Sequence, residues 1–571
     1  MTKLTRRAAL TVAAGAAAAC APKKHVERRS NAHEAAVGAF AHGVAAGDPS
    51  ADGFVVWSRL SGAEGPLSAR YEVSLSEDFS SLAAAGDLAT GPERDYTLKA
   101  EVTGLAPATT YFYRFRHGEA VSPTGRAKTL PTGALAAARF AIISCSNYPF
   151  GYFNVYDAIA ARDDFDAAIH LGDYIYEYSR EGYGGADGAR LGREHEPPHE
   201  ILTLSDYRRR HAQYKADPAA QAFHASLALI AIWDDHETAN DSWRDGAENH
   251  DAASEGPWPE RKRAAMQAYY EWMPIREPKA GAPAEAIFRD FAFGDLLTIT
   301  ALETRLMARA AAFEYDKIVP TLTDVAAIEN FKANILWADD RDMLGEAQRA
   351  FVEASLTRAR EAGQPWRIIA NQVIMANVTA PNLEPHVTEQ DLVELEREWP
   401  PARSFIKFST MGLPTNLDAW DGYPAAREKL YDTMRRTNAE GVIVITGDTH
   451  TWWANDLVAR DGRRIGVELG AHSVTSPSPY RKAFLGGKGE EYALLTGRDN
   501  KDVRYINGED HGYIDLHVTR EKASADFVAV DTIEATDYGV FVKCGFDVKK
   551  SGGVAQFASV RGLTLKQRAV F

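Results

Sequence analysis

The sequence predicts a large α/β domain built around parallel strands, preceded by a small all-β domain. Between residues 40 and 130, short segments rich in Val, Tyr and Phe, such as FVVW and TYFYRFR, are separated by Gly, Pro and Asp turns. This pattern is typical of antiparallel strands. From Arg139 onwards, short apolar segments alternate with amphipathic ones, as in RFAIISCS, GYFNVYDAIAAR and DAAIHLGD. Such alternation predicts βαβ units and a parallel sheet.

The small β domain is expected to span residues 40–130. Its segment LAPATTYFYRFR resembles the tyrosine-bearing end of a fibronectin-like or immunoglobulin-like sandwich. The domain offers no cluster of titratable residues, so we expect it to have a structural or docking role. Residues 21–39 are polar and charged, and we interpret them as a linker.

The α/β domain is expected to span residues 139–548, followed by a C-terminal tail at 549–571. Helices are expected at 151–162, 206–216, 260–272, 346–361 and 425–438. Besides the apolar runs, strands are expected at 287–293, 296–302 and 366–371. The loops at 182–200 and 378–420 are longer than a compact domain needs, which indicates a functional rim.

The charge of the chain excludes one class of partner. Its 571 residues carry a formal net charge of −15, and the Lys and Arg residues are scattered. Nucleic acid needs a basic face, so we expect no nucleic-acid partner, although nucleotides could be substrates. An acidic protein that handles phosphate needs a local cation, and a metal ion is one way to supply it.

The first 20 residues have the features of a signal peptide. MTKLTRRAAL is basic, and a short apolar stretch of small residues follows it. Arg6 and Arg7 resemble a twin-arginine signal, which would hand the protein to the export machinery and place it in the periplasm or cell envelope; an ordinary basic signal region is the alternative. Cys20 after AAAA resembles a lipoprotein cleavage site and suggests a lipid anchor. In an exported protein Cys145 and Cys544 could form a disulfide, but the surroundings of Cys145 favour another role.

Polar side chains follow four predicted strands where each strand ends. The four strand-end motifs are Ser144-Cys145-Ser146, Gly172-Asp173, Asp234-Asp235-His236-Glu237 and Gly447-Asp448-Thr449-His450. In open α/β sheets ligands bind beyond the carboxyl ends of the strands. We therefore expect these motifs to converge on one edge of one sheet and to form a metal site.

The ligand types at these strand ends are both hard and soft. Carboxylate and amide oxygens suit Ca²⁺ or Mg²⁺, whereas a thiolate and a phenolate suit a transition metal, Fe³⁺ in particular. Asp173 could bridge two metals, and such a pair can clamp a phosphate and acidify a bound water. Arg305 is expected to form an ion pair rather than meet substrate, while Trp452 and Trp453 could either pack in the core or wall the site.

The motifs resemble those of the metallophosphoesterases, and specifically of the PhoD-type alkaline phosphatases. The matching stretches are SCSNYPFGYFNVY, HLGDYIYEY, WDDHETANDSW, TGDTHTWWANDL, GVAAGDPSADGFVVWSRL and ELGAHSVTSP, in the expected order across residues 40–532. The resemblance implies a metallophosphoesterase-like layered sandwich, with sheets flanked by helices, behind the small all-β sandwich domain.

The resemblance also implies the cofactors and their ligands. Fe³⁺ would be held by Cys145, Asp173, Tyr176 and Asp448. One or two Ca²⁺ ions would share Asp173 and use Asn240 and His450. Of Asp234 and Asp235, either could point into the site, and Asp235 is taken as the ligand. His236 is the candidate to protonate the leaving oxygen or to polarise the phosphate.

The expected function is that of an exported, metal-dependent alkaline phosphatase. A metal-bound hydroxide would attack a small phosphomonoester and release phosphate. The alternative within the family is a phosphodiesterase, including a phospholipase D-like one. From other classes, an envelope binding protein with structural metals and a redox-active iron protein remain open.

Overall fold

The computed structural model describes residues 25–62, 64–398, 400–481 and 487–563. The expected signal peptide at 1–20, with Arg6, Arg7 and Cys20, lies outside the described residues, as do residues 564–571. In the described ranges, no helix has the length and apolar character needed to cross a membrane.

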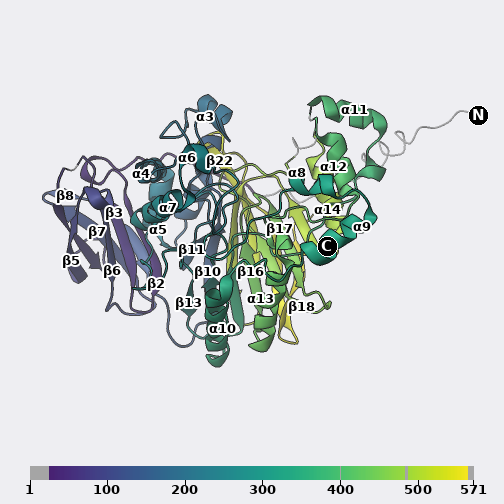
Figure 1. Cartoon of the computed structure of the whole chain (residues 1–571). Coiled ribbons are helices and arrows are strands. Elements are labelled where there is room, and N and C mark those ends of the chain that lie inside the picture. The colour runs from purple at the N-terminus through teal and green to yellow at the C-terminus, as the bar shows by residue number, and fades with distance from the viewer. Residues whose placement is uncertain (1–24, 63, 399, 482–486, 564–571) are drawn as a thin grey trace, which may run out of the picture.

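Three sheets organise the described part of the chain (Figure 1). The largest has the order β1-β22-β21-β20-β10-β11-β12-β2-β3-β6, with β23 beside β22. The second has the order β13-β14-β15-β16-β18-β17-β19, and the third the order β5-β4-β7-β8 with β9 beside β7.

The strands have the following bounds: β1 Glu27–Ser30, β2 Val44–Ser50, β3 Gly53–Arg59, β4 Leu67–Ser74, β5 Leu82–Thr90, β6 Thr97–Val102, β7 Thr110–His117, β8 Ala120–Val121, β9 Gly125–Lys128, β10 Ala137–Ile143, β11 Ala167–His170, β12 Ala228–Ala231, β13 Arg289–Phe293, β14 Leu297–Ala301, β15 Trp366–Ala370, β16 Val442–Thr446, β17 Trp452–Val458, β18 Arg464–Gly470, β19 Val503–Asn507, β20 Gly512–Thr519, β21 Ala523–Val530, β22 Asp537–Ser551 and β23 Val554–Arg561. The α-helices are α2 Asn154–Ala160, α3 Gly185–Leu191, α4 Leu204–Lys215, α5 Pro218–Ser226, α6 Ala252–Glu255, α7 Trp258–Trp272, α8 Tyr315–Ile318, α9 Val325–Asn330, α10 Gly345–Glu361, α11 Glu389–Glu398, α12 Ala402–Ser409, α13 Pro424–Arg436 and α14 Gly489–Asp499.

The two large sheets pack face to face and their outer faces carry helices. The core between them joins side chains of β10, β11, β20 and β21 to those of β14, β15, β16 and β18. Helices α2, α4, α5 and α7 pack on the outer face of the larger sheet, and α10 and α13 pack on the outer face of the second. Because the central strands are buried on both faces, they are almost wholly apolar, as in AAIH, ALIA and VIVIT. This layered α/β sandwich, preceded by an all-β region, is the fold class that the sequence predicts.

The small β domain shares its sheet with the α/β region. β2 pairs in parallel with β12, with Ala228 opposite Ala46 and Leu229 opposite Gly47. The strands β2, β3 and β6 therefore extend the largest sheet, while the five-stranded sheet packs against them over its own core. The expected separate sandwich is thus joined to the α/β region by backbone hydrogen bonds, which a local pattern of alternating residues does not reveal.

Four expected loop or tail segments contain regular structure. In the expected linker 21–39, β1 pairs with β22, with Glu27 opposite Val540. In the expected tail, β22 continues to Ser551 and turns into β23, which pairs back on it. The 182–200 loop contains α3, and the 378–420 loop contains α11 and α12. β1 gains its partner from β22, which is far from it in sequence, and this explains why its polar composition suggests unpaired chain.

Candidate metal centre

The four strand-end motifs meet, but across two sheets. β10, β11 and β12 are parallel neighbours in the largest sheet, so the first three motifs lie at one edge of it. The fourth follows β16, which belongs to the second sheet. The expectation of a single sheet edge was therefore wrong for Asp448 and His450. The two sheets pack face to face, so the end of β16 reaches the same place from the opposite layer.

The backbone at these strand ends is unusual. Cys145, Asp173, Asp448 and His450 all have positive φ, at 61°, 56°, 62° and 51°. Residues other than glycine adopt this left-handed conformation rarely, and it concentrates at functional sites. β10, β11 and β16 therefore each lead into a tight turn at a residue that presents its side chain to the centre.

The glycine of the second motif marks a close approach between strand ends. A Cβ added at Gly172 would lie 2.4 Å from the Cβ of Asp234, and φ at Gly172 is +104°. Glu237 ties the same strand ends together, because its carboxylate accepts from the backbone N–H groups of Asp173, Tyr174 and Asp234 at 2.6–3.0 Å.

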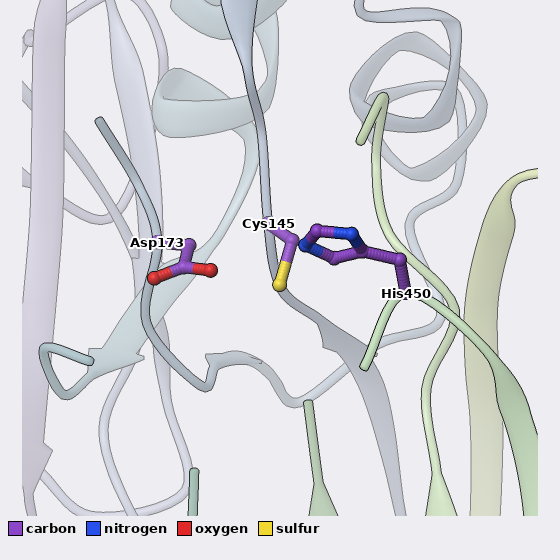
Figure 2. Close-up of side chains that lie close together, drawn as sticks. All are labelled: Cys145, Asp173 and His450. Atoms are coloured by element: carbon purple, nitrogen blue, oxygen red, sulfur yellow. The ribbon is translucent and has the colours of Figure 1, made fainter. Parts of the chain in front are cut away.

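The first group of possible ligands is Cys145, Asp173 and His450 (Figure 2). Their Sγ, carboxylate oxygen and ring nitrogen lie within 4.8 Å of one another. Tyr176 joins them, since its Oη lies 3.1 Å from Asp173 Oδ2 and 3.2 Å from His450 Nε2. Ser476 Oγ donates to Tyr176 Oη at 2.7 Å. Thiol, phenol, imidazole and carboxylate thus surround one point.

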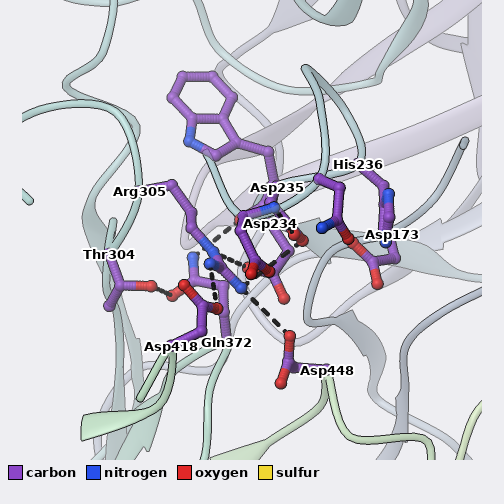
Figure 3. Close-up of polar contacts among 12 residues, drawn as sticks. Asp173, Asp234, Asp235, His236, Thr304, Arg305, Gln372, Asp418 and Asp448 are labelled. Atoms are coloured by element: carbon purple, nitrogen blue, oxygen red, sulfur yellow. Dashed lines mark hydrogen bonds and ion pairs between the residues drawn. The ribbon is translucent and has the colours of Figure 1, made fainter. Parts of the chain in front are cut away.

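Two further groups continue from the first (Figure 3). Asp173, Asp235 and His236 form one, and Asp234, Asp235 and Asp448 form the other, each with its ligand atoms within 4.8 Å. Asp173 is shared with the Cys145 group, and Asp235 is shared between these two. The three groups therefore form one continuous cluster that could hold more than one cation.

The structure divides the candidate ligands differently from the expected assignment. Asp448, expected beside Cys145, groups with Asp234 and Asp235, and His450 lies with Cys145 instead. Asp234 and Asp235 are both buried and both belong to the cluster. Asn240 lies on the adjoining loop, where its backbone N–H donates to Glu177 Oε1 at 2.7 Å and its Nδ2 donates to Glu248 Oε2 at 3.1 Å.

The buried carboxylates carry more negative charge than their protein partners offset. Asp173 Oδ1 and Asp234 Oδ2 are buried without a hydrogen-bond partner among the described residues. Burial raises the pKa of both carboxyls, and the neighbouring aspartates raise them further. Burial, opposed by Arg305, raises the pKa of Asp448 to about 7. Buried, unpaired carboxylate oxygens are costly unless a cation meets them, so this donor set fits metal ions.

The thiol of Cys145 would also be stabilised as a thiolate by a nearby cation. Burial and the charges of Asp173, Asp234 and Asp448 raise its pKa well above the ordinary value. A thiolate, the form that binds metal, is therefore disfavoured at this position unless a positive ion accompanies it. No disulfide joins Cys145 to Cys544.

Arg305 is the principal protein cation at the centre. It is fully buried, with Nε 2.5 Å from Asp234 Oδ1, Nη1 2.5 Å from Asp418 Oδ2 and Nη2 3.1 Å from Asp448 Oδ1 (Figure 3). It therefore forms ion pairs, as expected. Arg309 forms a further ion pair with Asp418.

His236 is oriented by a buried carboxylate. Its Nδ1 lies 2.7 Å from Glu177 Oε2, and its ring stacks on Tyr176 at 4.2 Å between centroids. Although burial opposes protonation, the carboxylates of Asp235, Glu177 and Asp173 raise the pKa of His236 well above its ordinary value. Glu177 thus fixes the orientation of the ring and its proton.

Sequence reasoning did not assign roles to Glu177, Asp418 or Ser476. Glu177 lies in the HLGDYIYEY stretch, so its nearness to Asp173 was a usable signal. Asp418 lies in the 378–420 segment, 113 residues from Arg305, without a motif around it. Only the fold brings it to the centre.

The chain is similar to known phosphatases along most of its length. A sequence model described as PhoD-like phosphatase matches residues 140–527, and one described as its N-terminal domain matches residues 24–131. Alkaline phosphatase D of Bacillus subtilis (strain 168) is 30% identical over 532 residues, which cover 90% of this chain and 81% of that protein. A solved structure of PhoD aligns with a TM-score of 0.74 and 27% identity, covering 92% of this chain and 94% of that one.

Proposed function

The chain belongs to the PhoD-like phosphatase family and is a phosphoric ester hydrolase of the alkaline phosphatase D type, and from this premise we propose that it is an exported, metal-dependent enzyme that releases phosphate from small phosphomonoesters. The matching family is described as a phosphatase family, and the Bacillus subtilis relative is named as an alkaline phosphatase. The phosphodiesterase alternative is therefore not favoured.

The observation that carries the proposal is the continuous buried cluster from Cys145 to Asp448. The soft thiol and the phenol of Tyr176, together with Asp173 and His450, are suited to Fe³⁺. The carboxylates of Asp234, Asp235 and Asp448 are suited to Ca²⁺. This division keeps Asp173 as the shared ligand and exchanges the expected places of Asp448 and His450. Asn240 is retained as a candidate calcium ligand on the adjoining loop.

Bound cations supply Lewis-acid chemistry, acidifying a water molecule and offsetting the charge that develops on the phosphoryl oxygens. The chain contributes the other parts. His236, oriented by the contact of its Nδ1 with Glu177, is placed to bind a phosphoryl oxygen or to give a proton to the leaving oxygen. Arg305 acts as a positioning residue, since its donors hold Asp234, Asp418 and Asp448 in fixed places.

The proposal that the protein is exported rests on residues that lie outside the described ranges. The twin-arginine pattern at Arg6 and Arg7 would carry a folded, metal-loaded protein to the periplasm or cell envelope, and Cys20 would be the place of a lipid anchor. Replacing both arginines by lysine should stop export. Normal export of that variant with full metal content would contradict this part of the proposal.

The central test is a metal analysis of the purified protein, with its visible spectrum and its rate of phosphate release. We expect iron with a tyrosinate charge-transfer band, and activity that a calcium chelator removes and added Ca²⁺ restores. Asp173→Asn should abolish turnover and lower the content of both metals, because that carboxylate is shared. Asp461→Asn, at an exposed ion pair with Arg463, is the matched control.

Three outcomes would contradict the proposal. Zinc or manganese alone, without colour, would reject the assignment of Cys145 and Tyr176. If the metal-loaded wild-type protein bound a ligand but did not turn it over, this would favour the envelope binding protein. A reversible colour change at an accessible potential, with no phosphate release, would favour the redox protein.

A further inference from the structure

A cavity opens beside the metal centre. Its volume is about 390 Å³, and Asp448, Thr449 and His450 form part of its lining. The remaining lining comes from the 374–421 region, from Trp453 and from the segments that hold Pro479, Tyr480 and Tyr492. A group attached to a phosphoryl held at Asp448 would therefore extend into this space.

The wall of the cavity is largely aromatic. Tyr480 and Tyr492 stack with ring centroids 5.2 Å apart and an interplanar angle of 19°. Trp453 meets Tyr480 edge to face at 5.7 Å, and Phe405 on α12 lies 6.0 Å from Tyr492 on α14. Ile374 and Val378 add aliphatic surface. Such a wall suits a ring or another flat apolar group.

The charges around the cavity restrict the ligand further. In the described part of the lining the charged side chains are Asp421 and Asp448, and no Lys or Arg contributes. Asp421 is already neutralised, because Arg427 Nη1 lies 2.6 Å from its Oδ1 and the backbone N–H of Val378 donates to its Oδ2 at 2.7 Å. A second phosphate or carboxylate on the substrate would meet no counter-ion there.

We propose that this cavity binds the organic group of the substrate and selects phosphomonoesters of uncharged, ring-bearing alcohols. The inference rests on the proposed function, since it places the phosphoryl group at the metal centre. In the reaction water adds to phosphorus, the ester P–O bond breaks, and the alcohol leaves with that oxygen and a proton. The cavity holds this alcohol before and after the bond breaks.

The test compares two esters within one preparation of metal-loaded enzyme. Benzyl phosphate carries a ring and glycerol 2-phosphate does not, and both release an alkoxide oxygen. Phe405→Ala and Tyr492→Ala should each lower the ratio of kcat/KM for benzyl phosphate to that for glycerol 2-phosphate by roughly 3- to 10-fold, the loss of one aromatic contact. A misfolded fraction cancels in this ratio.

The control is Phe351→Ala, a partly buried ring on α10 that packs on Phe288 at 5.0 Å and does not line the cavity. The ratio of kcat/KM for benzyl phosphate to that for glycerol 2-phosphate should be the same in Phe351→Ala as in the wild-type enzyme. A binding measurement gives an independent result: both cavity variants should weaken inhibition by phenylphosphonate more than inhibition by methylphosphonate.

An unchanged ratio in both cavity variants, with unchanged relative inhibition, would overturn the inference. Failure of the proposed function has a different result, because the loaded wild-type enzyme would then release phosphate from neither ester.

Discussion

Replacing Arg305 by methionine should destabilise the protein by removing the main positive charge from the centre. The guanidinium is fully buried and contacts Asp234, Asp418 and Asp448 at 2.5–3.1 Å. Methionine has a similar length but no charge, so the substitution leaves carboxylates buried beside one another. Removing one partner of a buried ion pair costs about 3–5 kcal/mol. Because Asp234 and Asp448 both lose their partner, while Asp418 keeps its ion pair with Arg309, we expect the upper part of that range.

The loss is large beside a typical unfolding free energy of about 5–15 kcal/mol. It can be followed by urea unfolding, with the fluorescence of the 11 tryptophans as the signal. The unfolding free energy of Arg305→Lys should fall between those of the wild-type protein and Arg305→Met, because an ammonium keeps the charge but cannot present three directed donors. Arg463→Met is the matched control, since the ion pair of Arg463 with Asp461 is exposed to solvent and contributes little to stability.

Adding metal ions to Arg305→Met provides a second test of the same reasoning. Bound cations supply part of the positive charge that the variant lacks, so adding Ca²⁺ and iron should recover more stability in Arg305→Met than in the wild-type protein. The reasoning would be refuted if Arg305→Met unfolded at the same urea concentration as Arg463→Met. It would also be refuted if chelation affected the variant no more than the wild-type protein.

Three further predictions follow from single residues. Cys145→Ser should lose most of its iron on dialysis while keeping calcium, because a hydroxyl is a poor ligand for Fe³⁺; equal iron retention would contradict the assignment. Burial lowers the pKa of His170 from 6.5 to about 3, so its contribution to stability is complete above pH 6.5 and declines as the pH falls towards 3. In the wild-type protein His170 Nε2 lies 2.9 Å from Tyr156 Oη, and the amide of His170→Gln offers a polar group without a charge change in its place. This variant should therefore lose about 2 kcal/mol less unfolding free energy than the wild-type protein between pH 7 and 5 in urea unfolding, and identical losses would contradict this. Gly47→Val should unfold the protein or strongly lower its Tm, because an added Cβ would lie 2.3 Å from the Pro274 carbonyl oxygen and 2.6 Å from that of Leu229; a normal Tm would show that β2 and β12 do not pair as described.

The local sequence was enough to predict the buried central strands and the residues that end them. Buried runs such as AAIH and VIVIT are visible because both faces of each strand are covered. The helix expected at 206–216 is α4, Leu204–Lys215, and its start is set by a local feature, the capping box of Thr203 and Asp206. Ligand types could be read from the strand-end motifs, because a thiol, a phenol and carboxylates restrict the metals that can bind.

Only the tertiary structure decided how those residues are grouped. His450 lies beside Cys145, and Asp448 lies beside Asp234, because β16 belongs to a second sheet whose packing angle and depth no local pattern encodes. Asp418 reaches Arg305 across 113 residues of sequence, and the pairing of β2 with β12 joins two regions that appear separate in the chain. Periodicity reports which face of an element is buried, whereas these contacts depend on which distant element buries it.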